Sequence, residues 1–118
     1  MGSSVLTPAA VLRRLTELTP EVHAAILLEG DGSLAAADPR AGDLGARLRE
    51  LTLALLDGAD AARGERPAEI EVTTPAGAVY VVRGERATLA VVAGRLVLSS
   101  LMRFDLRSLL TELEGAPA

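Results

Sequence analysis

Five residue types are missing from this 118-residue chain: cysteine, lysine, asparagine, glutamine and tryptophan. Without cysteine there is no disulfide framework, no thiol nucleophile and no cysteine-bound zinc. Without lysine there is no phosphate-binding loop of the P-loop type, because that loop needs a lysine before its serine or threonine. All twelve basic residues are arginines, and this bias, with the abundance of alanine and leucine, indicates a GC-rich bacterial genome.

Positive charge and long apolar runs are also scarce. The formal net charge is −4 and the pI is about 5.0. Because phosphate binding needs clustered cations, this balance predicts no nucleic-acid partner. No apolar run approaches the roughly 18 residues that span a bilayer, and the first residues lack the pattern of a secretory signal. We therefore expect a cytoplasmic protein with no membrane partner.

The composition that remains is that of a folded protein. Hydrophobic residues make up 49% of the chain and charged residues 24%, and the two kinds are interspersed. This balance is typical of globular proteins and not of disordered segments. The length predicts a single domain over residues 1–118, with an ordered core from about residue 8 to residue 114.

Turn residues and apolar spacing predict eight elements. Thr7 and Pro8 form a typical helix start, and Pro20 ends that helix. The expected strands cover residues 22–28, 34–38, 69–74, 78–83 and 87–93, and the other two helices cover 43–63 and the segment from Ser99 or Ser100 to about 114. Asp31-Gly32 predicts a hairpin with a tight primed turn. The order α-β-β-α-β-β-β-α predicts an α+β fold around one five-stranded antiparallel sheet.

No catalytic or metal-binding motif stands out. His23 is the only histidine and lies in an expected strand, so it is expected to be an ordinary strand residue. The acidic residues around the hairpin, Glu29, Asp31 and Asp38, do not follow the calcium-loop pattern and are expected to be solvated. Ser99 and Ser100 precede a helix and are expected to cap it. The sequence leaves open a Ser-His-Asp or paired-carboxylate site assembled from distant residues, but we expect no enzyme and no cofactor.

The helices carry more leucine than one buried face can hold. At 100° per residue the middle helix places four leucines within about 60°, and Leu53 and Leu56 lie on the far side. The four are Leu44, Leu48, Leu51 and Leu55. The second face indicates either a deeply buried helix or, as we expect, a surface for a partner. On the last helix Phe104 lies off the main stripe, and it could anchor an interface or fold back over the sheet edge or the helix start.

Several segments together resemble the roadblock family of dynein light chain-like proteins. They are AAILLEGDGSLAAAD, IEVTTPAGAVYVVR, ATLAVVAG and SLMRFDLRSLLTEL, with the long leucine- and alanine-rich helix between the first two. Together with the order of the elements, the match extends from about residue 8 to residue 114. The resemblance implies a roadblock- or profilin-like sheet with helices on both faces. It also implies a homodimer in which the middle helices pack antiparallel and the strands after them join into one ten-stranded sheet.

The resemblance further implies a function without catalysis by this chain. Bacterial members of the family resemble regulators of small Ras-like GTPases, which act by repositioning the GTPase's own catalytic residues. The residues expected at the dimer or partner interface are Leu53, Leu56, Arg49, Glu69, Glu71 and Thr73. Arg47 and Glu50 are further polar candidates for GTPase docking. Two other functions remain open, a tethering subunit that changes no rate and a small-molecule sensor.

Overall fold

The structure, a computed structural model, describes residues 7–38, 42–63 and 68–115. Its elements follow the predicted order and lie within one or two residues of the predicted bounds. They are α1 (Pro8–Leu18), β1 (Val22–Glu29), β2 (Leu34–Ala37), α2 (Asp43–Arg63), β3 (Glu69–Thr74), β4 (Gly77–Arg83), β5 (Ala87–Gly94) and α3 (Ser99–Glu114). The predicted α+β class is confirmed.

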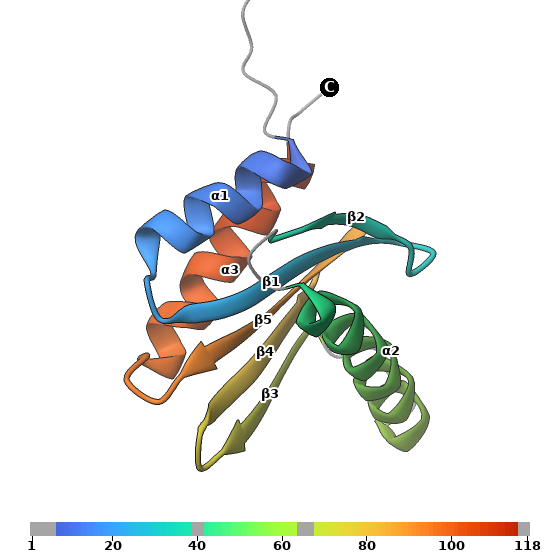
Figure 1. The fold of residues 1–118 in the computed structure, drawn as a ribbon. Coiled ribbons are helices and arrows are strands. Elements are labelled where there is room, and N and C mark those ends of the chain that lie inside the picture. The colour runs from blue at the N-terminus through green and yellow to red at the C-terminus, as the bar shows by residue number, and fades with distance from the viewer. Residues whose placement is uncertain (1–6, 39–41, 64–67, 116–118) are drawn as a thin grey trace, which may run out of the picture.

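The five strands form one antiparallel sheet in the order β2-β1-β5-β4-β3. β5, the last strand of the chain, is the central strand, and it pairs with β1 on one side and β4 on the other. The long helix α2 carries the chain from the β2 edge of the sheet to the β3 edge (Figure 1). β2 and β3 are therefore the edge strands of the described sheet.

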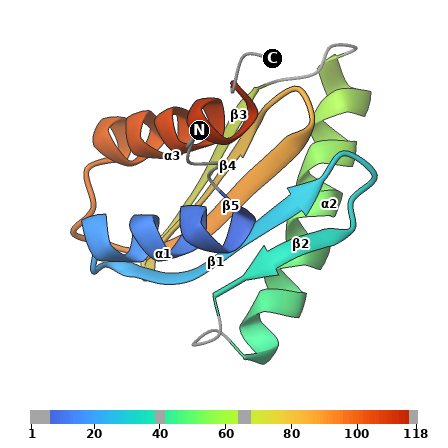
Figure 2. The same ribbon diagram turned by 90° about the horizontal axis from the view of Figure 1, so that it is seen from above.

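Both faces of the sheet are covered by helices. α1 and α3 lie together on one face, and α2 lies alone on the other (Figures 1 and 2). Side chains alternate between the two faces along β1, so that Leu27 joins the α1–α3 cluster while Ile26 and Leu28 join the α2 cluster. Because both faces are buried from Ala24 to Leu28, β1 contains the continuous apolar run AAILL rather than an alternating pattern.

The helix starts follow the prediction for α1 but not for α3. Thr7 caps α1, and its hydroxyl accepts the amide of Ala10 at 3.1 Å. In α3 the N-cap is Leu98, which makes no side-chain capping bond, and Ser99 is already the first helical residue. The prediction that serine caps this helix was wrong, because the Ser99 hydroxyl bonds to side chains of the sheet instead.

The β1–β2 hairpin forms where predicted but with a different turn. Its ladder closes through Glu29 and Ser33, which leaves three residues in the loop, and only Gly32 has a positive φ, of 88°. A three-residue loop with glycine in the last position explains this geometry better than the two-residue primed turn that was expected. The carboxylate of Asp31 accepts the hydroxyl and the amide of Ser33, and these bonds lower the pKa of Asp31.

The end of α3 is tied to the turn between β4 and β5. The carboxylate of Glu114 accepts the amides of Glu85, Arg86 and Ala87 at 3.0, 2.6 and 2.7 Å. The Arg86 guanidinium also donates to the carbonyl of Glu114, at 2.6 Å. One carboxylate thus gathers three backbone donors and fixes the last turn of α3 against the sheet.

Candidate functional site

The orientation of α2 decides which of its leucines can meet a partner. Gly45, Leu48 and Thr52 are buried against the sheet, and α2 packs mainly over β1 and β5. Leu53 and Leu56 are half-buried and pack against the same apolar cluster as Leu48. The expectation that they form a second, outward face was therefore wrong. The side of α2 that faces the sheet is centred between the stripe of four leucines and the pair Leu53 and Leu56. Their role at an interface stays a prediction.

One flank of α2 packs toward the β1–β2 turn. The Nε atom of Arg49 donates to the carbonyl of Gly32 at 2.8 Å. The Leu53 side chain lies over Gly32, so closely that a side chain at that glycine would press on it. Arg49 is therefore engaged within the chain, whereas Arg47 and Glu50 are exposed and remain available for docking.

The opposite flank of α2 presents apolar surface. Leu44 is 38% exposed and Leu51 is 43% exposed, while Leu55 between them is half-buried and packs against the α2-side core. The three residues lie within about 40° of one another around the helix. We refer to Leu44, Leu51 and Leu55 as the α2 apolar flank. The predicted apolar surplus on α2 thus exists, but Leu44 and Leu51 expose it, whereas Leu53, Leu55 and Leu56 are half-buried.

The edge strand β3 offers backbone groups to a further strand. The amide of Arg83 donates to the carbonyl of Ala68, just before β3. Because hydrogen-bonded residues alternate along an antiparallel ladder, the amides and carbonyls of Glu69, Glu71 and Thr73 point away from β4. These are the three β3 residues that the sequence predicted at an interface. The structure places them at the described edge of the sheet.

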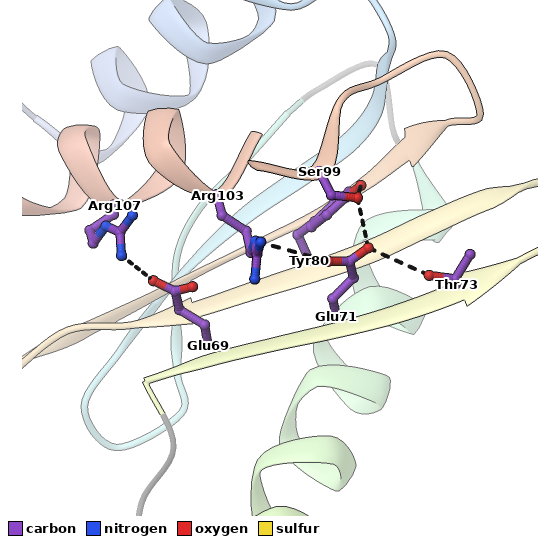
Figure 3. Close-up of polar contacts among 7 residues, drawn as sticks. All are labelled: Glu69, Glu71, Thr73, Tyr80, Ser99, Arg103 and Arg107. Carbon is purple, nitrogen blue, oxygen red and sulfur yellow. Dashed lines mark hydrogen bonds and ion pairs between the residues drawn. The ribbon is translucent and has the colours of Figure 1, made fainter. Parts of the chain in front are cut away.

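The side chains of the same residues face α3 and form a polar network (Figure 3). Arg107 donates to Glu69 at 2.7 Å, and Arg103 lies 3.9 Å from Glu71. These two arginines, one helical turn apart, match two glutamates spaced by two along the strand. The sequence analysis missed these arginines, although a spacing of four on a helix and of two on a strand is compatible with two ion pairs between the elements.

A hydrogen-bonded chain extends the network toward the centre of the sheet. The Ser99 hydroxyl donates to Glu71 at 2.8 Å, and it lies 3.1 Å from the Tyr80 hydroxyl. The Thr73 hydroxyl approaches the same Glu71 oxygen at 3.5 Å. The carboxylate row on β3 is therefore held in place and partly neutralised from within the chain. Its side chains are already engaged, and its outward backbone groups are what β3 offers to a partner.

The remaining candidates for chemistry lie apart from this surface. His23 is exposed on β1, and Glu29 and Asp31 are exposed beside the hairpin loop, as expected. Asp38 is buried, so the expectation that it is solvated was wrong. Within residues 7–38, 42–63 and 68–115, no three histidine or acidic side chains come together as a metal site would require. Of the helices in those ranges, none has the length and apolar character needed to cross a membrane.

Comparisons with known proteins bear on the fold. No protein-family model matches the chain, and no curated protein matches it in sequence. Among solved structures, a Roadblock/LC7 domain from Streptomyces avermitilis aligns over 89% of this chain and 92% of its own, with 21% identity and a TM-score of 0.69. MglB from Myxococcus xanthus aligns over 98% of this chain and 90% of its own, with 18% identity and a TM-score of 0.73.

A third solved structure extends the likeness beyond these two. Profilin IB from Acanthamoeba castellanii aligns over 95% of this chain and 98% of its own, with 21% identity and a TM-score of 0.63. All three identities are low, so the agreement lies in the arrangement of strands and helices. The chain has the fold of Roadblock/LC7 domains and of MglB, a fold close to that of profilin.

Proposed function

We propose that this chain is a non-enzymatic module that forms a homodimer in the cytoplasm and there binds a small Ras-like GTPase as a regulator or scaffold. The observation that carries the dimer is the open edge of β3. A strand edge with three sets of outward amides and carbonyls is a template for a further strand, and a second copy of the same edge satisfies it by two-fold symmetry. The sheet would then continue from one protomer into its partner.

The charges along β3 are compatible with such pairing. Two acidic edges would repel each other if their carboxylates stood alone, because like charges opposite one another destabilise a strand pair. Here Glu69 and Glu71 each lie beside an arginine of α3. Each edge therefore brings its own counter-charges, and the backbone groups can pair without two uncompensated rows meeting.

The α2 apolar flank supplies the second contact of the proposed dimer. Leu44 and Leu51 are exposed in the isolated chain, and covering them removes apolar surface from water. Antiparallel packing of the two α2 helices would bring the flank of one protomer against that of its partner. This contact replaces the one expected through Leu53 and Leu56, which pack within the chain.

The GTPase part of the proposal is supported by the family resemblance. The resemblance to the roadblock family extends from about residue 8 to residue 114, and bacterial members of that family resemble regulators of small Ras-like GTPases. Exposed Arg47 and Glu50 on α2 give the dimer polar groups with which to dock a partner. The chain would contribute a surface, and the GTPase would supply the reacting groups.

Proline substitution tests the edge pairing. Thr73→Pro removes an outward amide and leaves the bonds of β3 to β4, since proline is tolerated on the solvent side of an edge strand. We expect Thr73→Pro to stay folded and to become monomeric, while Thr73→Val stays dimeric. A folded, dimeric Thr73→Pro variant would contradict pairing through β3.

A turnover assay tests the GTPase part separately. Small Ras-like GTPases of the source organism, loaded with GTP, are assayed for binding and hydrolysis with the wild-type chain and with Thr73→Pro. A change in turnover that requires the wild-type dimer supports regulation, and binding without a rate change supports the tethering alternative. A wild-type dimer that binds none of these GTPases contradicts this part and leaves the dimer intact.

A further inference from the structure

A second apolar surface lies where α1 ends and α3 begins. Four leucines meet there: Leu18 on α1, Leu96 and Leu98 in the β5–α3 loop, and Leu101 in the first turn of α3. Leu96 is 83% exposed and Leu98 is 69% exposed, and more than half of each of the other two side chains is also exposed. They line a hollow of about 260 Å³ whose floor includes the buried Met102. We refer to these four leucines as the end patch.

Neighbouring Phe104 enlarges the end patch. It lies one helical turn beyond Leu101 on α3, and spacing of three residues places the two side chains next to each other on the helix surface. Phe104 is 57% exposed, so the chain's single phenylalanine does not fold back over the sheet edge or the helix start. Isolated exposed leucines are ordinary, but a contiguous group around a hollow marks an interaction site.

The rim of the hollow is acidic. Its charged lining residues are Glu21 and Asp105. In the described part of the chain, neither carboxylate takes part in an ion pair or a side-chain hydrogen bond. An occupant that places cations at this rim would gain two charge contacts beside the apolar one.

The end patch lies away from the α2 apolar flank. The end of α1 and the start of α3 lie on the face of the sheet opposite α2 (Figure 1). A second copy does not suit the patch, because a two-fold contact would bring two pairs of like carboxylates together. An anionic membrane surface does not suit it for the same electrostatic reason.

We propose that the end patch docks an amphipathic segment of another protein, with apolar side chains for the hollow and arginine or lysine residues for the rim. Such a segment places leucines or similar residues at helical spacing into an apolar groove and its cations at the edge. Each chain would then bind a second copy through the dimer surfaces and an amphipathic segment of another protein through its end patch.

Two synthetic peptides test the proposal. Both have about 14 residues with leucines at helical spacing, and their other positions are lysine in one and glutamate in the other. Binding to the wild-type chain is measured by fluorescence anisotropy at low and moderate salt. We expect the leucine-lysine peptide to bind at least about tenfold more tightly than the leucine-glutamate peptide, and increasingly weakly as salt rises.

Matched variants locate the binding. The double variant Leu96→Ser, Leu98→Ser keeps the fold because both side chains are exposed, and it should weaken the leucine-lysine peptide at least about tenfold. Leu34→Ser changes an exposed leucine on β2 and should leave binding unchanged. The double variant Glu21→Gln, Asp105→Asn should weaken binding and reduce its dependence on salt.

Five results would overturn the proposal. Three of them are equal binding of the two peptides, unchanged binding by the double serine variant, and a loss of peptide affinity in Leu34→Ser as large as that in the double serine variant. The fourth is a change of oligomeric mass in the double serine variant, which would assign the end patch to a second copy. The fifth result concerns vesicles of anionic phospholipid. If the wild-type chain binds them and the double serine variant does not, the end patch would be a membrane site, which contradicts a protein partner.

Discussion

Thr52 offers a sharp test of how α2 packs on the sheet. Its side chain is 0% exposed, and its hydroxyl has no hydrogen-bond partner among the described residues. Burying a hydroxyl without a partner costs about 1–3 kcal/mol. Valine has nearly the same shape and a similar helix propensity, so Thr52→Val removes this cost without opening a cavity. We expect the free energy of unfolding to rise by about 1–2 kcal/mol.

The change is measurable by thermal and urea unfolding at one protein concentration. For a chain of 118 residues, an increase of about 1–2 kcal/mol corresponds to a rise in Tm of roughly 4–8 °C. Thr111→Val on the exposed side of α3 is the control and should change the stability by less than about 0.5 kcal/mol. Thr52→Ser keeps the hydroxyl and loses a methyl group, and should lower the stability by about 1 kcal/mol.

A loss of stability in Thr52→Val would refute the reasoning. It would mean that the hydroxyl has a partner or meets water, and that α2 does not press Thr52 onto the sheet. The α2 apolar flank would then no longer be placed by the packing of the helix. The proposed contact through Leu44 and Leu51 would lose its structural basis.

Three further predictions follow from named contacts. The exposed fractions of Leu44 and Leu51, doubled by two-fold symmetry, represent about 2–5 kcal/mol of burial. Leu44→Ser with Leu51→Ser should therefore raise the dimer dissociation constant, measured by sedimentation equilibrium, roughly 30- to 4,000-fold. Glu114→Ala removes the carboxylate that accepts three backbone amides, and water partly replaces it as acceptor. Urea unfolding should show that the free energy of unfolding falls by about 1–2 kcal/mol. The pKa of Asp31 lies below its ordinary value of 3.8, so its contribution to stability is present above pH 3.8 and is lost as the pH falls through the folded-state pKa. In Ser33→Ala, an NMR titration of the carboxyl should show that pKa returning toward 3.8, and an unchanged pKa would contradict the assigned cause.

Much of the fold could be predicted because local signals agree with one another. Thr7-Pro8 and Pro20 mark the two ends of α1, and Asp31-Gly32 marks the first hairpin. Each signal depends on the chemistry of a few adjacent residues, so no knowledge of the tertiary structure was needed. The strand order of the sheet was not among these predictions, because it depends on which distant strands meet.

The candidate site was harder to predict because it depends on the rotation of one helix. Four leucines on α2 form a narrow stripe, and placing that stripe at the centre of the buried side was the simplest interpretation. In the structure the buried side is centred nearer Thr52, because small and polar residues such as Gly45 and Thr52 allow the helix to approach the sheet. The positions of the leucines alone do not show which side of the helix comes closest to the sheet. The arginines that neutralise β3 were missed for a related reason, since their partners lie on a different element.

The solution mass of the wild-type chain tests the central claim most directly. Light scattering on the purified chain, over a range of concentrations, measures whether two copies associate. The account predicts a mass near twice 12.2 kDa. A mass of 12.2 kDa that persists at high concentration would contradict it, since the β3 edge and the α2 apolar flank would then remain open in solution.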